Sequence, residues 1–262
     1  MSKQIFIFTT LLLLLMSISI NATAQRRKVL NLPSYDQSPY HFGFILGLNH
    51  MLFTVKPVDN LSSIKWDSDQ SPDVFGDSMY VYSVTSTPTP GFSVGILANL
   101  RLGKNTDLRF IPTLLFGERI LNYEILRYKT NSETGEVEKL MVGIQKSITS
   151  TIVEVPLEFR YKSKRVNNFR AYVLAGIKYS LDLASQKKTS DSEVSTVAKL
   201  NRSDIAIESG VGFEFYTTYF KFGTELKMGY GLRNLIIPED NIYSGSIDKL
   251  HSKVFLLSFT FE

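Results

Sequence analysis

The sequence predicts an all-β protein, an eight-stranded antiparallel up-and-down transmembrane β-barrel with long extracellular loops and short periplasmic turns. Apolar and polar residues alternate in eight separate segments, which is typical of strands, because a helix repeats its apolar positions every three or four residues. Short and long connections alternate along the chain, as they do in outer-membrane barrels. The chain also begins with the pattern of an export signal.

Residues 1–24 have the pattern of a cleaved secretory signal peptide. Lys3 precedes an apolar run that ends at Ile20, and the small residues Ala22 and Ala24 form a cleavage site. The run is short for a membrane anchor, which is the alternative and needs about 20 apolar residues. Residues 25–39 then form a periplasmic leader, and residues 40–262 form the outer-membrane barrel.

Composition excludes several classes of protein. The formal net charge is only +4, which gives no reason to expect a nucleic-acid partner. Cysteine is absent, so the chain has no disulfide framework, thiolate metal site or cysteine nucleophile. After the signal, no apolar stretch is long enough for a transmembrane helix. Strands that cross a membrane must close into a barrel, because an open edge in lipid leaves backbone groups unpaired.

The eight segments and their connections follow in order. Strands are expected at residues 40–55, 91–103, 107–119, 150–163, 169–183, 204–216, 219–231 and 255–262. Long connections are expected at about 56–90, 120–147, 183–203 and 231–251, and short turns lie between the other strands. In the second long connection, two apolar-rich stretches flank a turn at 131–135. The hairpin is therefore expected to extend beyond the membrane.

Each segment has one apolar face and one face that carries charges. In the segment 150–163, Val155 and Leu157 share one face, and Glu154, Glu158 and Arg160 share the other. A soluble lipocalin-like barrel would turn the apolar face inward, whereas an outer-membrane barrel turns it toward lipid. Most strand glycines share the parity of the charged residues, and glycine suits a crowded barrel interior. The glycines therefore favour the barrel with apolar residues outside.

The charged faces are expected to form a network inside the barrel. An eight-stranded barrel is only wide enough for side chains to fill it, and buried charges must pair to offset their desolvation. The predicted lumen charge network consists of Arg101, Arg109, Glu154, Glu158, Arg160, Lys178, Glu208, Glu214, Lys221, Glu225 and Lys227. The two signs are mixed, so a plugged barrel is favoured over a diffusion pore. Pro112 and Pro156 each remove a ladder donor, which predicts local bulges or a weakened hairpin.

No catalytic, cofactor or metal site is predicted. His50 and His251 are near the ends of the first and last strands and could meet at the outer rim, but no nucleophile motif accompanies them. Gly-rich phosphate loops and metal-ligand spacings are absent from the sequence. The acidic residues of the first long loop, Asp67, Asp69, Asp73 and Asp77, lack the spacing of an EF-hand. We expect no enzyme, cofactor or small-molecule substrate, and we expect outer-membrane lipid around the barrel.

The stretch NLPSYDQSPYHFGFILGLNHMLFTVKP resembles the PorT family of Bacteroidetes outer-membrane proteins. Its most specific part comprises Pro39, His41, Phe42, Gly43, Phe44, Leu46, Gly47 and Asn49, with Tyr40 between the proline and the histidine. The layout of signal peptide, short leader and small barrel is also similar, while the other strands match only the general pattern of outer-membrane barrels. The resemblance implies a component of the type IX secretion system, which exports surface proteases, adhesins and gliding-motility proteins, and it carries over no catalytic residues.

A filled barrel cannot itself pass a folded protein, so the implied role is accessory: assembly, stabilisation or partner docking. The expected partners are other secretion-system proteins in the membrane or periplasm. Residues 25–38 of the leader and the four long loops are expected to make the contacts. A generic structural or adhesive barrel and a small narrow channel are the alternatives.

Overall fold

Strands make up nearly all of the regular structure. The computed structural model describes residues 29–67, 70–71, 74, 76–131, 133, 135–184 and 198–262. The predicted signal peptide, 1–24, and residues 25–28 of the leader lie outside the described residues. Within the described part of the chain, no helix has the length and apolar character to cross a membrane.

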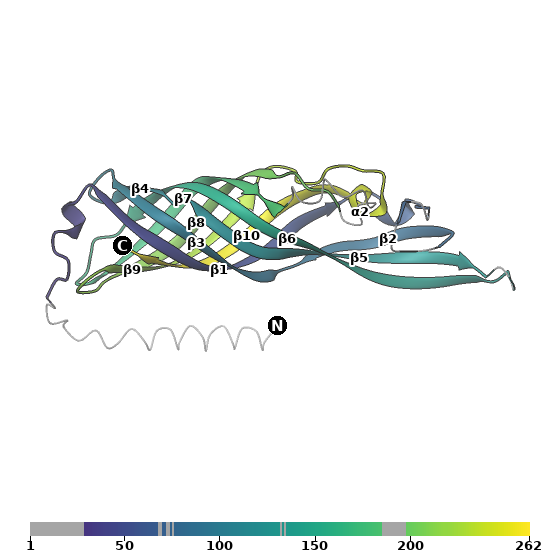
Figure 1. The fold of residues 1–262 in the computed structure, drawn as a ribbon, viewed down its shortest axis with the longest axis horizontal. Helices are drawn as coiled ribbons and strands as arrows, with labels where there is room; N and C mark the ends of the chain where they lie inside the picture. The colour runs from purple at the N-terminus through teal and green to yellow at the C-terminus, as the bar shows by residue number, and fades with distance from the viewer. Residues whose placement is uncertain are drawn as a thin grey trace, which may run out of the picture.

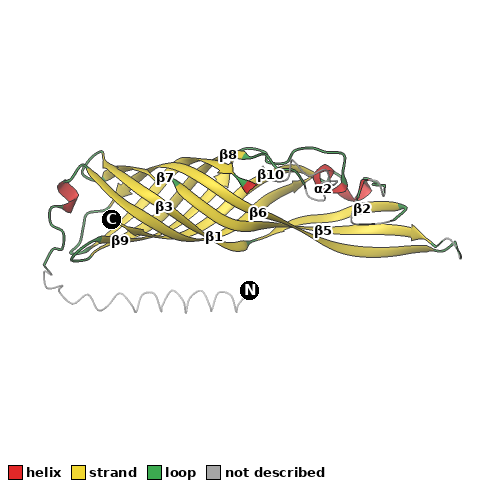
Figure 2. Ribbon diagram, in the orientation of Figure 1, coloured by secondary structure: helices red, strands yellow, loops and turns green. Residues whose placement is uncertain are grey.

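The elements follow the chain in a simple order (Figure 2). The strands are β1 Tyr40–Pro57, β2 Ser78–Thr87, β3 Thr89–Arg101, β4 Thr106–Phe110, β5 Thr113–Thr130, β6 Val137–Lys162, β7 Phe169–Asp182, β8 Ser203–Tyr216, β9 Lys221–Gly231 and β10 Ile247–Phe261. The short helices are the 3-10 turns η1 Tyr35–Gln37 and η2 Leu61–Ser63, and the single-turn helix α2 Ile242–Gly245.

The strands close into a ring. Antiparallel neighbours run β1-β10-β9-β8-β7-β6, β6 pairs with β4 and β5, and β3 pairs back with β1. Only Pro88 separates β2 from β3, and only residues 111–112 separate β4 from β5. The ten segments therefore form eight walls, and the predicted eight-stranded up-and-down fold is confirmed (Figure 1).

The two ends of the ring differ, as the spacing predicts. The turns at 102–105, 163–168 and 217–220 lie at one end, with the leader and the chain end at Glu262 (Figure 1). We call this the short-turn end. The opposite, long-loop end carries the remaining connections, and β5 and β6 project beyond it as the predicted hairpin, paired from Thr113↔Glu154 to Thr130↔Val137.

The first long connection is more ordered than the sequence predicts. The expected loop at 56–90 contains β2, which pairs with the upper part of β5. A β-bulge between Val81 and Ser83 shifts the register of β2. Such a bulge places two residues opposite one and reverses the parity of the side chains, so β2 lacks the strict alternation by which the other strands can be recognised.

Pro112 and Pro156 share one gap in the sheet. Pro156 lies opposite the break between β4 and β5, and its carbonyl accepts a hydrogen bond from Ile111 N at 3.4 Å. The register of β6 is unchanged across the break, from Phe110↔Leu157 to Thr113↔Glu154. The predicted bulges are therefore wrong, and the predicted weakening takes the form of an interrupted ladder. Pro112 faces β3, where its carbonyl accepts from Ile96 N at 3.1 Å, and Pro156 faces Ile111, so the two missing donors lie on either side of the same two-residue break.

Apolar side chains cover the outside of the ring and charged side chains fill its inside. Ile96 and Leu226, both lipid-type residues on the outer face, are 66% and 58% exposed, whereas Arg109 and Arg160 are fully buried. This arrangement is opposite to that of a soluble barrel and is the one expected in a membrane.

A hydrophobic cluster caps the lumen at the long-loop end. Side chains of the upper strands pack against those of the loops and of α2: Phe53, Leu61, Trp66, Val74, Met79, Val81, Val84, Leu121, Tyr123, Ile125, Ile148, Ala198, Leu235, Ile236, Ile242, Tyr243, Ile247 and Leu250. We call this set the loop cap. It gives the long connections a core of their own, which stabilises them above the charged lumen.

Close packing inside the ring leaves little room for a side chain at some of the inward-facing glycines. A Cβ built at Gly212 would lie 2.3 Å from the Tyr172 ring, whereas one at Gly143 meets nothing within 4 Å. We expect Gly212→Ala to destabilise the fold by about 1–3 kcal/mol, as overpacking does, and Gly143→Ala to have no such effect. The stability of both variants is measured as the temperature at which the folded band is lost in semi-native gels. Equal shifts of that temperature would contradict the conclusion that Gly212 is packed inside the ring and Gly143 is not.

Candidate functional site

The charged faces of five strands converge on the lumen. Ten of the eleven predicted network residues, all except Arg101, are buried. They come from β4 (Arg109), β6 (Glu154, Glu158, Arg160), β7 (Lys178), β8 (Glu208, Glu214) and β9 (Lys221, Glu225, Lys227). Side chains alternate along a strand, so each of these strands sends every second residue inward.

Nearest the short-turn end, arginines and carboxylates pair across the ring. Arg109 contacts Glu225 and Glu262, and Arg160 contacts Glu214. Lys221 joins the two groups, because its Nζ lies 3.1 Å from Glu214 and 3.0 Å from Glu262. Charge-assisted bonds of this kind are the strong ones, and here they tie β4 and β6 to β8, β9 and the chain end.

Further up the lumen, two lysines bridge four carboxylates. Lys227 Nζ lies 2.7 Å from Glu158 Oε1 and 3.4 Å from Glu208 Oε1. Lys178 Nζ lies 2.9 Å from Glu154 and 3.2 Å from Glu208. Lys227 also approaches Glu225 at 3.7 Å, which connects this group to the arginine pairs below. The ten residues therefore form one continuous network.

Tyr172 of β7 stands in the middle of the network. Its hydroxyl donates to Glu225 Oε1 at 2.5 Å, and the Arg160 guanidinium lies 3.9 Å from the centre of its ring. A cation over a ring face gains electrostatic stabilisation when it is shielded from water. The Tyr172 ring occupies the space that Gly212 leaves on the neighbouring strand.

Several charged lumen residues are absent from the predicted set. Arg119 donates to Asp182 at 2.8 Å and to Ser150 at 2.7 Å, and Lys162 lies 2.7 Å from Asp107. Glu262, although the last residue, has a fully buried side chain. Strand parity places Arg119, Lys162 and Asp182 on charged faces, so parity alone, applied to the strand ends, would have found them.

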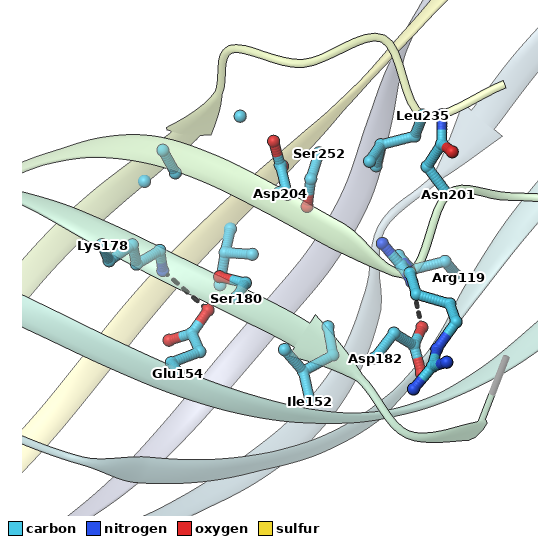
Figure 3. A pocket seen from close by; sticks show the side chains of 15 residues that line it. Arg119, Ile152, Glu154, Lys178, Ser180, Asp182, Asn201, Asp204, Leu235 and Ser252 are labelled. Carbon is cyan, nitrogen blue, oxygen red and sulfur yellow. Dashed lines mark hydrogen bonds and ion pairs between the residues drawn. The ribbon is translucent and has the colours of Figure 1, made fainter. Parts of the chain in front are cut away.

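A small polar cavity separates the network from the loop cap. Its volume is about 30 Å³, enough for a water molecule or two but not for a ligand of ordinary size. Figure 3 shows the ion pairs Lys178–Glu154 and Arg119–Asp182 at its wall, with Asp204 opposite. The cavity is thus a small gap with room only for water within the otherwise filled lumen.

The leader closes the short-turn end. Both carboxylate oxygens of Asp36 accept hydrogen bonds from Arg170, at 2.9 and 2.8 Å, and Tyr216 donates to Asp36 at 3.2 Å. Tyr35 stacks on His41, with ring centres 3.8 Å apart. Burial alone would raise the pKa of Asp36, but the hydrogen bonds and charge of Arg170 outweigh it and lower that pKa.

Arg101, the remaining predicted network residue, belongs to this closure and not to the network. Its side chain is half-buried at the rim, where it donates to the carbonyls of Asp36 and Gly103. The strand that carries Arg101 ends there, so its side chain lies beside the leader instead of deep in the lumen.

The structure does not bring the two candidate histidines together. His251 lies opposite Thr54, whereas His50 lies opposite Phe255, four residues further along each strand. His251 Nδ1 donates a hydrogen bond to the Gly231 carbonyl at 3.1 Å, and the ring stacks on Tyr230. Across the described residues, no group of three or more histidines and carboxylates is arranged to hold a metal ion.

The acidic residues of the first long loop do not gather either. Asp77 accepts a hydrogen bond from Thr130 N at 2.6 Å, and Asp67 pairs with Lys65 at 3.2 Å. Asp69 and Asp73 lie outside the described residues.

Removing one lysine from the network tests its role in stability. Lys227→Met would leave Glu158 and Glu208 buried without their shared cation, so we expect a loss of about 3–5 kcal/mol. The free energy of unfolding in urea, with the protein in lipid vesicles, measures it. Lys56→Met, which breaks the exposed pair of Lys56 and Asp248, is the control and should change nothing measurable. A similar small effect for both would contradict the analysis.

Docking of the leader should depend on Asp36 and on pH. Because the pKa of Asp36 is lowered in the folded state, its contribution is complete above the usual value of about 4 and is lost as the pH falls through the lowered value. A spin label at Leu30→Cys, the single cysteine of the chain, should be immobile at pH 7 and mobile in strong acid. Asp36→Asn should mobilise it already at pH 7, whereas Asp248→Asn should not. An unchanged spectrum in Asp36→Asn would contradict this dependence and would leave the bonds of Asn31 to Asn168 and Tyr216 as the contacts that hold the leader.

Comparison with known protein families agrees with this architecture. No curated protein sequence matches the chain. Among solved structures, Neisserial surface protein A is similar over 85% of this chain and 98% of that chain, with 11% identity and a TM-score of 0.39. A bacterial polysaccharide outer membrane secretin is similar over 84% and 97%, with 8% identity and a TM-score of 0.22. The family model of the outer membrane protein beta-barrel domain matches residues 24–236, so the chain belongs to that family and to the outer membrane.

Proposed function

We propose that this outer-membrane barrel is a non-enzymatic, non-conducting accessory component of type IX protein secretion, as its resemblance to the PorT family implies. In this role it assembles with, stabilises or docks other secretion-system proteins. The observation that carries the proposal is the filled lumen, in which the leader, the charge network and the loop cap follow one another from end to end.

The filled lumen argues against transport through the barrel itself. The network side chains are buried and paired, and the cavity above them has room only for water. An eight-stranded ring leaves no space for a polypeptide beside such side chains. These observations support a protein that acts through its outward surfaces, namely the loops, the projecting hairpin and the two rims.

The described part of the leader makes its contacts within the chain. Asn31 bonds to Asn168 and Tyr216, and Asp36 bonds to Arg170. A periplasmic partner would therefore meet the leader already folded onto the rim. This form of docking costs less ordering entropy than capture of a free segment.

A structural or adhesive role is the second candidate. The feature that favours it is the hairpin of β5 and β6, which carries exposed side chains such as Met141, 50% exposed, well beyond the ring (Figure 1). Exposed apolar side chains on a rigid projection are typical of interaction surfaces. Such a surface serves adhesion as well as assembly, so the two roles must be separated by experiment.

Secretion and conductance together test the proposed function. We expect deletion of the gene to block the export of type IX cargo, and the reintroduced gene to restore it. Normal export combined with altered envelope integrity or surface binding would favour the structural or adhesive role instead.

Conductance of the purified protein in planar bilayers is expected to stay at the level of the protein-free bilayer. A steady conductance that Glu158→Gln alters would show a channel through the network and contradict the proposal. A porin in the same bilayer is the positive control.

A further inference from the structure

Three strands continue beyond the ring as a small sheet of their own. We call it the distal sheet; it consists of β2 with residues 117–130 of β5 and 137–150 of β6, and it projects from the long-loop end (Figure 1). β6 has 26 residues and its neighbour β7 only 14. The β6–β7 ladder ends at Ile152↔Asp182, so above that point β6 pairs with β5 alone.

The outer edge of β6 in the distal sheet has free backbone groups. Leu183 N donates to Thr151 O at 2.8 Å, which fixes odd-numbered residues as those that point away from β5. From Lys139 to Thr149 every second residue therefore directs its N–H and C=O outward, and within the described part of the chain no backbone group bonds to them. Unpaired edges of this length are templates for a further strand.

The opposite edge of the distal sheet is covered. Trp66 and Met79 exchange two backbone hydrogen bonds of 2.9 Å at the outer edge of β2, and Ser86 Oγ accepts from Phe53 N at 2.9 Å. Among the residues that the structure describes, the chain thus covers one edge of the distal sheet and leaves the β6 edge open.

Side chains beside the open edge suit a protein partner. On the outer face, a polar band of Glu118, Asn122, Glu124, Gln145, Ser147 and Thr149, interrupted by Ile120, lies above the lipid-facing residues. Beyond this band a second apolar patch begins on β2 and β5, where Tyr80, Tyr82, Leu126 and Tyr128 line a hollow of about 140 Å³. On β6, Met141 lies opposite Leu126 and is 50% exposed. The band separates the patch from the lipid-facing surface, so membrane insertion does not explain it.

The inner face of the same edge is apolar as well. Leu140, Val142 and Ile144 continue the inner surface of β6 outward from the loop cap, and Leu140 is 41% exposed. Lys146 interrupts this inner row, with its Nζ 4.5 Å from the centre of the Tyr243 ring. A strand added beside β6 would therefore find mainly apolar neighbours on the inner face, and on the outer face Met141 beside polar side chains such as Gln145. Backbone bonds would supply affinity and alternating side chains specificity.

We propose that the β6 edge from Lys139 to Thr149 binds an extended segment of a separate cell-surface or exported protein, which adds to the distal sheet as its fourth strand. An extended polypeptide alone can satisfy a row of alternating donors and acceptors. A second copy in the same membrane runs its β6 in the same direction and cannot form the antiparallel ladder. The inference deepens the proposed docking role and rests on it for the choice of a protein partner.

Hydrogen exchange of the full-length protein, resolved by residue, tests the proposal. In purified protein in detergent, we expect the amides of Met141, Gly143, Gln145 and Ser147 to exchange fast, and in native outer membranes roughly tenfold or more slowly, since a ladder bond must then open first. The even-numbered amides pair with β5 and should be slow in both, which provides an internal control.

A matched pair of variants identifies the occupant as a strand. Gln145→Pro removes an edge donor that β5 does not use and should abolish the added protection without unfolding β6, whereas Gln145→Thr should keep it. Slow exchange already in the purified protein would mean that the chain itself or a second copy covers the edge. Fast exchange in both settings would also overturn the proposal. So would protection that survives Gln145→Pro, because a glycan bound to the tyrosine patch would give that result.

The same variants separate this inference from the proposed function. If Gln145→Pro loses protection but exports type IX cargo normally, the strand-binding edge stands and its secretion role fails. If gene deletion blocks export while the edge exchanges fast in every setting, the secretion role stands and the edge is not the contact.

Discussion

The pairing of charges inside a ring too narrow for bulk water is the constraint on which the structure depends. The lumen buries eight basic side chains (Arg109, Arg119, Arg160, Lys162, Arg170, Lys178, Lys221 and Lys227) and nine acidic ones (Asp107, Glu154, Glu158, Asp182, Asp204, Glu208, Glu214, Glu225 and Glu262). An isolated ion there would cost several kcal/mol, so near-balance and contact are both required. A pair such as Lys227–Glu158 joins residues 69 apart in sequence, and the network therefore fixes which walls face one another across the ring.

This constraint explains how much the sequence predicts. Parity along each strand is a local property, and it places Glu158 or Lys227 inside without any knowledge of their partners. Asp36 has no such signal: it lies in the leader, residues 25–39, which has no alternation, and its partner Arg170 is 134 residues away. β2 could not be predicted for a related reason. The bulge at Val81 adds one residue to the strand, which reverses the parity of the side chains on which strand prediction depends. The position of Pro156 opposite the break that contains Pro112 likewise could not be predicted, because it depends on the register between β5 and β6, which only the folded sheet fixes.

The two closures of the lumen use different physics. At the short-turn end the closure is polar, because Asp36 and Tyr35 complete hydrogen bonds that Arg170 and Glu262 offer at the rim. At the long-loop end it is apolar, because residues such as Tyr243 and Ile242 of α2 are fully buried against the upper strands. A loop cap needs many residues to bury enough apolar area, which gives a physical reason for long connections at that end. Short turns suffice where a few hydrogen bonds complete the seal.

When one hairpin of a closed barrel is longer than its neighbours, the part that projects has an unpaired edge, as the distal sheet does. Closure removes every sheet edge only where neighbouring strands have the same extent. β6 exceeds β7 by about half its own length, so the edge that the ring abolishes within the membrane returns outside it. The polar side chains Gln145, Ser147 and Thr149 keep the lower part of that edge soluble, and Glu138 and Lys139 place charges at its tip. Between them, Leu140 and Met141 are 41% and 50% exposed. An edge that needed only to remain inert would carry charge or proline along its whole length, so exposed apolar side chains in the middle of this edge support a surface that a partner covers.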